Sequence, residues 1–160
     1  MPEELKGSRQ GKGLRIAIVV SRFNQTVTDR LLEGARERLL SHGVKEEDIT
    51  LAWVPGALEL AVVVQALADS GRYQAIIALG SVVRGDTGHY DVVVNRSTES
   101  LAQVSLETGI PVVMGVLTTE NMDQAMDRAG GKKGNKGYDV ALAALEMANL
   151  MRLIGEKDKS

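Results

Sequence analysis

A segment near the middle of the chain combines side chains and backbone groups that suit a phosphorylated substrate. Residues 78–94 read ALGSVVRGDTGHYDVVV, an apolar run followed by a polar turn and the start of a predicted helix. The turn supplies backbone N–H groups, a hydroxyl, a guanidinium and an imidazole, from Arg84, Gly85, Asp86, Thr87 and His89. Unpaired N–H groups ahead of a helix and the helix dipole both favour an anion. The segment therefore predicts a phosphate site beside a proton-transfer group.

His89 is one of only two histidines in the chain. An imidazole ordinarily titrates near neutral pH, which suits general acid–base catalysis, although a single histidine near a helix start is often structural. The neighbouring anion loop favours catalysis at this position. A metal role is not expected, because His42 lies at the far end of a predicted helix and no compact Asp, Glu and His cluster completes a coordination shell. We interpret His42 as a structural helix-end cation.

The composition is that of one globular domain. Of 160 residues, 44% are hydrophobic and 25% are charged, and the formal charge of −2 indicates neither a nucleic-acid nor a membrane-surface partner. The chain has no cysteine, which excludes disulfides, thiol catalysis and cysteine-ligated metal. No apolar run reaches the roughly 18 residues of a membrane span, and the first residues lack the apolar core of a signal peptide. We therefore expect a cytoplasmic protein.

Short apolar runs alternate with segments of helical spacing along the chain. Strands are expected at residues 15–21, 50–54, 75–81 and 111–118. Helices are expected at residues 26–43, 57–71, 91–108, 121–130 and 138–153. This alternation predicts an α/β fold, a doubly wound sandwich of three layers with a parallel sheet and helices on both faces. Residues 14–154 would form a single domain, between a flexible N-terminal arm (1–13) and a solvated tail (155–160).

Helix boundaries can be predicted in more detail at two places. Thr26 and Asp29 match a capping box that would open the first helix. The segment 130–137 reads GGKKGNKG and is expected to be a plain link into the last helix.

Ligands of such sheets bind outside the carboxyl ends of the strands, so the segments that follow the four strands should meet at one edge. Phe23, the only phenylalanine, follows the first strand, and its ring would either stack on a planar heterocycle or fold over the core. Glu59 lies in a first helical turn, where it would accept hydrogen bonds from a polyol or only compensate the helix dipole.

Two cations, Arg128 and Lys136, fall outside this edge. The helix that precedes Arg128 runs away from the edge, so Arg128 should lie on the order of 10 Å from the site of its own subunit. It is either a solvated surface residue or part of a neighbour's pocket, and the second option predicts an oligomer.

Six motifs follow one another in a characteristic order: SRFN (21–24), VPGALEL (54–60), ALGSVVRGDTGHYDVV (78–93), GVLTTEN (115–121), QAMDRAG (124–130) and GNKG (134–137). Over residues 16–152 the chain thereby resembles the 6,7-dimethyl-8-ribityllumazine synthase family of riboflavin biosynthesis. The resemblance implies condensation of 5-amino-6-(D-ribitylamino)uracil with 3,4-dihydroxy-2-butanone 4-phosphate, without metal or organic cofactor. We also expect a flavodoxin-like, four-stranded sheet with strand order 2-1-3-4.

The resemblance also implies roles for individual residues. Phe23 would stack on the pyrimidine ring and His89 would transfer protons. The remaining substrate contacts would come from Ala57, Leu58 and Glu59 to the ribityl chain, from Ser81, Val82 and Val83 to the pyrimidine edge, from Gly85, Asp86 and Thr87 to the phosphate, and from Met114, Arg128 and Lys136 of an adjacent subunit. The family often has phenylalanine at position 114 and an aromatic residue at position 58, so Met114 and Leu58 are departures from its pattern.

The assembly implied by the resemblance is a homo-oligomer with active sites between adjacent subunits. It is either a pentamer or a hollow icosahedral shell of pentamers, and the short link 130–137 favours the shell. Riboflavin synthase is the candidate protein partner. Two alternative functions stay open, a flavodoxin-like module that binds a flavin or pyrimidine without turnover and a mainly structural, shell-forming protein.

Overall fold

The computed structural model describes residues 1–86 and 88–158 and is built on one parallel sheet. The sheet has four strands in the order β2-β1-β3-β4. Their bounds are Ile16–Ser21 for β1, Ile49–Val54 for β2, Ala75–Val83 for β3 and Val112–Thr119 for β4. The predicted fold class and strand order are therefore confirmed. The two inner strands carry the apolar runs, since all of β1 and nearly all of β3 are buried.

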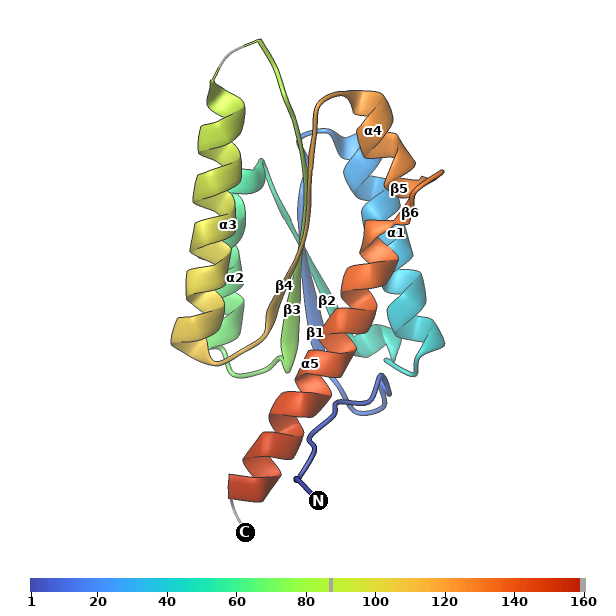
Figure 1. The fold of residues 1–160 in the computed structure, drawn as a ribbon, viewed down its shortest axis with the longest axis vertical. Helices are drawn as coiled ribbons and strands as arrows, with labels where there is room; N and C mark the ends of the chain where they lie inside the picture. Colours follow the sequence, from blue (N-terminus) through green and yellow to red (C-terminus); the bar gives the residue numbers. More distant parts are fainter. Residues whose placement is uncertain (87, 159–160) are drawn as a thin grey trace.

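Helices cover both faces of this sheet, giving three layers (Figure 1). One layer contains α2 (Leu60–Asp69) and α3 (His89–Thr108), and the other contains α1 (Gln25–Ser41), α4 (Met122–Asp127) and α5 (Lys136–Asp158). Short 3-10 turns, η1 (Glu46–Asp48) and η2 (Ala57–Glu59), precede β2 and α2. No helix in the described part of the chain is both long and apolar enough to cross a membrane.

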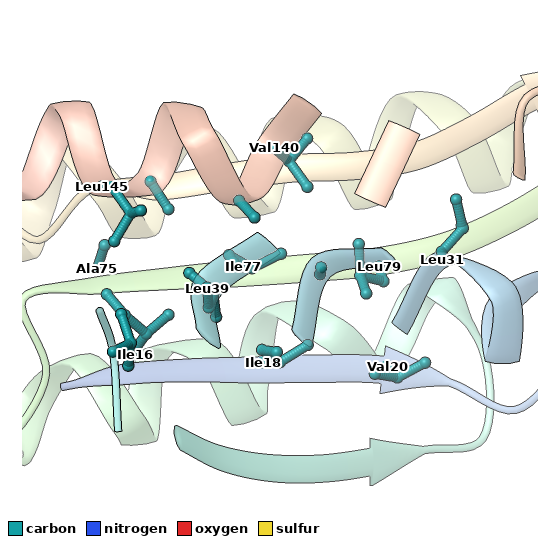
Figure 2. Close-up of a cluster of buried hydrophobic side chains, with 14 of the residues drawn as sticks. Ile16, Ile18, Val20, Leu31, Leu39, Ala75, Ile77, Leu79, Val140 and Leu145 are labelled. Atoms are coloured by element: carbon teal, nitrogen blue, oxygen red, sulfur yellow. The ribbon is translucent and has the colours of Figure 1, made fainter. Parts of the chain in front are cut away.

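Alternate residues of the inner strands build two cores, one on each face. On one face, Ile16, Ile18 and Val20 of β1 pack with Ile77 and Leu79 of β3 and with apolar side chains of α1 and α5 (Figure 2). On the other face, residues such as Val19, Ala78 and Val82 pack against α2 and α3. Because side chains of a strand alternate between faces, a continuous apolar run is what a strand covered on both sides requires.

The packing of α5 against α1 depends on a close backbone approach. A Cβ atom at Gly137 would lie 2.0 Å from the carbonyl oxygen of Leu31, so only glycine fits this crossing. Asn135 fixes the crossing, because its Nδ2 donates to the Arg30 carbonyl oxygen (3.2 Å) and its Oδ1 accepts from the Gly137 N–H (2.7 Å). These contacts assign the asparagine and second glycine of the GNKG motif to helix packing.

Three polar contacts support the same pair of helices and the N-terminal residues. The Tyr138 hydroxyl donates to Glu37 (2.9 Å), and this hydrogen bond is the main cause of its raised pKa. The side chain of Asn149 on α5 donates to the carbonyl oxygens of Ser8 (2.8 Å) and Gln10 (2.9 Å), so the first residues lie along α5 (Figure 1). The division into a flexible arm, a domain and a solvated tail stays a prediction.

The structure corrects the predicted ends of two helices, α1 and α5. Thr26 does not open α1 with a capping box, because the helix begins at Gln25 and its N-cap residue is Asn24, in the left-handed conformation (φ 61°). Helix α5 begins earlier and ends later than the predicted Tyr138–Leu153.

The structure also corrects the predicted element order, because residues 130–137 are not a plain link. This segment contains an antiparallel hairpin of β5 (Ala129–Gly131) and β6 (Gly134–Asn135), with a left-handed glycine at Gly134 (φ 84°). Two strands this short have no apolar alternation, so hydrophobic pattern alone does not reveal them.

Candidate functional site

A cavity of about 300 Å³ opens at the carboxyl end of the sheet, on the face covered by α2 and α3. Its lining comes from the segments that follow β1 and β2, from the last residues of β3 and Gly85 after it, and from the first turns of α3. The lining residues are Phe23, Gly56, Ala57, Leu58, Glu59, Ser81, Val82, Val83, Gly85, His89, Tyr90 and Val93. The cavity thus brings together nine of the residues that the sequence predicted as substrate contacts or as the proton-transfer group.

Phe23 lies at this cavity with 69% of its surface exposed. The alternative in which Phe23 folds over the core is therefore wrong. The loop that carries it is held by Asn24, whose Nδ2 donates to the Ser81 carbonyl oxygen at the end of β3 (2.8 Å). The N–H of Phe23 donates to the Pro55 carbonyl oxygen (3.0 Å) in the loop after β2. These bonds tie three strand ends together around the exposed ring.

Asn24 is expected to contribute to stability through both its conformation and its side chain. Asn24→Ala should lower the free energy of unfolding by about 2 kcal/mol, because alanine is strained in the left-handed region and removes the bond to Ser81. Asn24→Gly should cost about 1 kcal/mol, since glycine adopts this conformation freely. Denaturant unfolding measures the free energy of unfolding of both variants. If Asn24→Ala were as stable as Asn24→Gly, alanine would not be strained in the left-handed conformation at this position.

Glu59 and His89 both line the cavity and come from two different elements, η2 and α3. Glu59 closes the η2 turn, and a Cβ atom at Gly56 would lie 3.2 Å from its Oε1, so the glycine leaves room for this carboxylate. His89 is the first residue of α3. Tyr90 and Val93, which the sequence did not single out, also line the cavity, and Val93 was accessible from sequence because it lies one helical turn after His89.

The structure tests two of the three predicted phosphate contacts, Gly85 and Asp86. Asp86 is exposed and is not among the lining residues, and Thr87 lies outside the described part of the chain. Gly85 does line the cavity. Of the described residues 84–86 of the predicted anion loop, Gly85 alone therefore lines the cavity.

The remaining predicted residues, Met114, Arg128 and Lys136, do not line this cavity. Met114 is half-buried on the edge strand β4, where it packs against the core beneath α2 and α3. Arg128 and Lys136 line a second cavity of about 400 Å³, whose other lining residues are Val116, Leu117, Thr118, Lys133 and Asp139. Lys133, which the sequence analysis did not single out, adds a third cation there.

Neither histidine belongs to a metal-binding cluster, since residues 1–86 and 88–158 contain no group of three or more His, Cys, Asp or Glu arranged to hold a metal ion. His42 is structural, as predicted. It follows the last residue of α1, with Nδ1 3.0 Å from the Arg38 carbonyl oxygen and 3.2 Å from the Ser41 hydroxyl.

A protein-family model matches almost the whole predicted domain. The model described as 6,7-dimethyl-8-ribityllumazine synthase matches residues 13–152. All six sequence motifs, the sheet and both cavities lie within that range. The chain therefore belongs to the 6,7-dimethyl-8-ribityllumazine synthase family, whose transferases act in riboflavin biosynthesis.

Proposed function

We propose that this protein condenses 5-amino-6-(D-ribitylamino)uracil with 3,4-dihydroxy-2-butanone 4-phosphate to give 6,7-dimethyl-8-ribityllumazine, phosphate and water. The observation that supports it is the cavity at the sheet edge, where an exposed ring, a carboxylate and an imidazole from Phe23, Glu59 and His89 share one lining. A flat ring suits a pyrimidine, a carboxylate accepts hydrogen bonds from a polyol, and an imidazole moves protons.

The chemistry needs only groups of this kind. The 5-amino group attacks the ketone, and loss of water gives an imine. Phosphate then leaves by elimination, the ribityl-bearing nitrogen closes the ring, and water leaves again. Each step moves a proton, which His89 would give or take. Holding the two substrates in contact would contribute further, because it turns a bimolecular reaction into one within a complex.

The phosphate would lie at the mouth of the cavity, near the N–H groups of Gly85 and Asp86. It would need cations, and no lysine or arginine is among the described residues that line the cavity. Arg128, Lys133 and Lys136 line the second cavity, beside β4 at the free edge of the sheet. We propose that a neighbouring chain presents these residues to the phosphate, with Met114 contributing an apolar contact, so that each active site lies between two subunits.

Product formation tests the proposal directly. The protein is mixed with both substrates, and lumazine fluorescence is followed, with either substrate omitted as the control. Fluorescence that needs both substrates supports the proposal. Binding of the pyrimidine without product would contradict it and favour a non-catalytic binding module.

The mass of the particle tests the shared site. One chain has a mass of 17.2 kDa, and a pentamer and a shell of twelve pentamers differ about twelvefold in mass. Sedimentation separates these assemblies from a monomer. A monomer that forms product would contradict the contribution of a second subunit.

Arg128→Ala should raise the KM for the phosphorylated substrate by about 10- to 100-fold, because a hydrogen bond to a charged group contributes about 1.5–3 kcal/mol. The KM for the pyrimidine substrate should change much less. Steady-state kinetics with each substrate varied in turn measures both values. Arg152→Ala, an exposed arginine on α5, is the matched control and should leave both KM values unchanged. Equal KM values for Arg128→Ala and the unmodified protein would contradict the assignment.

A further inference from the structure

Arg84 joins three elements at the edge of the sheet where the cavity opens. It directly follows β3, and its N–H donates to the carbonyl oxygen of Thr119, the last residue of β4 (2.9 Å). Its side chain then contacts both the segment after β4 and the first turn of α3. Gly85, the next residue along the chain, lines the cavity.

The Arg84 guanidinium contacts two carboxylates and one aromatic ring. Nε lies 3.1 Å from Oε1 and 2.9 Å from Oε2 of Glu120. A terminal nitrogen lies 3.7 Å from Oδ1 of Asp91, and Cζ lies 4.3 Å from the centroid of the Tyr90 ring. Tyr90 and Asp91 follow His89 directly, and Tyr90 itself lines the cavity. One side chain therefore connects the strand end at Glu120 to the helical turn that carries His89.

Glu120 is held in turn by the start of α4. The backbone N–H of Glu120 donates to Oε1 of Gln124 (2.9 Å). The Gln124 N–H in turn donates to Oδ1 of Asn121, the N-cap residue of α4 (2.9 Å). Arg84 thus pairs with a carboxylate whose main chain is fixed.

We propose that Arg84 is a positioning residue, which acts through Glu120, Tyr90 and Asp91 to hold Gly85, Asp86 and the first turn of α3 in place. This inference rests on the proposed function, because it concerns the same phosphate. The alternative is that Arg84 binds the phosphate directly. In the structure its guanidinium is engaged by two carboxylates and a ring, which favours positioning over direct binding.

The two roles predict opposite effects for one substitution. If Arg84 is a positioning residue, Arg84→Gln should raise the KM for the phosphorylated substrate about 5- to 20-fold and lower kcat several-fold, and Glu120→Gln should shift both in the same direction by less. If Arg84 binds phosphate directly, Glu120→Gln releases the guanidinium and should lower that KM. A lower KM for Glu120→Gln would overturn the proposal.

Further variants separate positioning from general stability. The double variant Arg84→Gln/Glu120→Gln should be no worse than Arg84→Gln alone, because the two residues act as one pair. Arg72→Gln is the matched control, since Arg72 lies over the ring of the adjacent Tyr73 (5.2 Å) just before β3, at the opposite end of the sheet. Its KM values should be unchanged. A loss of active protein at constant KM for Arg84→Gln would indicate a merely structural role and overturn the proposal.

Hydrogen exchange tests the inference without the reaction. In the substrate-free protein, Arg84→Gln should speed exchange of the amides of residues 88–91, while Arg72→Gln should not. Hydrogen exchange thereby tests the positioning role of Arg84 independently of the proposed function. If the unmodified protein forms no lumazine, the proposed function fails, whereas unchanged exchange in Arg84→Gln would refute the positioning role even in an active enzyme.

Discussion

Replacement of His89 by alanine is expected to lower kcat by about 10²- to 10⁴-fold without abolishing turnover. His89 is the first residue of α3 and lines the cavity that also contains Phe23 and Glu59. Imine formation, phosphate elimination and dehydration all need a proton donor or acceptor, and alanine provides neither. The residual rate would come from holding the two substrates together. Steady-state kinetics of lumazine formation measures kcat and both KM values, and the KM values should change little.

The second histidine provides the control. His42 contacts the end of α1 and lies outside the cavity lining, so His42→Ala should leave kcat unchanged apart from any loss of folded protein. His89→Gln should behave like His89→Ala, because an amide makes hydrogen bonds but does not shuttle protons near neutral pH. Unchanged kinetics in His89→Ala would remove the proton-transfer role and leave binding and proximity as the sources of catalysis.

Mixed oligomers connect this result to the shared site. If His89 acts with Arg128 of a neighbouring chain, subunits carrying His89→Ala and subunits carrying Arg128→Ala should restore activity when they are co-expressed. Random mixing would rebuild about a quarter of the sites, because a site is intact only where an Arg128→Ala chain receives its arginine from a His89→Ala chain. Activity no higher than that of the separate variants would place both residues in one chain's site.

The sequence predicted the sheet and most of the first cavity for the same physical reason. Continuous β-branched runs at β1 and β3 form only where both faces are covered, and parallel strands bring their carboxyl ends to one edge. The sequence therefore places Phe23, Glu59 and His89 at one edge of the sheet, since each lies in the segment between a strand and the first turn of the next helix.

Features that depend on contacts between distant segments were not predictable in this way. Asn24 caps α1 in a left-handed conformation, and its side chain is engaged by Ser81 on another strand. The β5–β6 hairpin has no apolar period, and Asn135 fixes it by bonding to Arg30 on α1. The three partners of Arg84 lie on segments whose spacing in sequence gives no signal of contact.

Gly137→Ala is expected to lower the free energy of unfolding by about 3 kcal/mol or more, because the added methyl group meets backbone rather than a mobile side chain. Its Cβ would lie 2.0 Å from the carbonyl oxygen of Leu31 and 2.9 Å from Oδ1 of Asn135. Helix α5 would have to move away from α1, opening the core that Val140 and Leu145 share with the sheet. Denaturant unfolding at one fixed protein concentration measures the loss.

A glycine in the same helix separates this clash from helix propensity. A Cβ atom at Gly155 has no neighbour within 4 Å, so Gly155→Ala should stabilise the protein by roughly 0.5–1 kcal/mol. The difference between the two variants therefore reports the crossing of α5 over α1. Because Lys136 lies beside Gly137 and its N–H donates to the Arg128 carbonyl oxygen (2.8 Å), displacement of α5 should also move the cations of the second cavity. Gly137→Ala should accordingly raise the KM for the phosphorylated substrate in the protein that remains folded. If Gly137→Ala and Gly155→Ala were equally stable, the close crossing of α5 over α1 would not be a source of stability at Gly137.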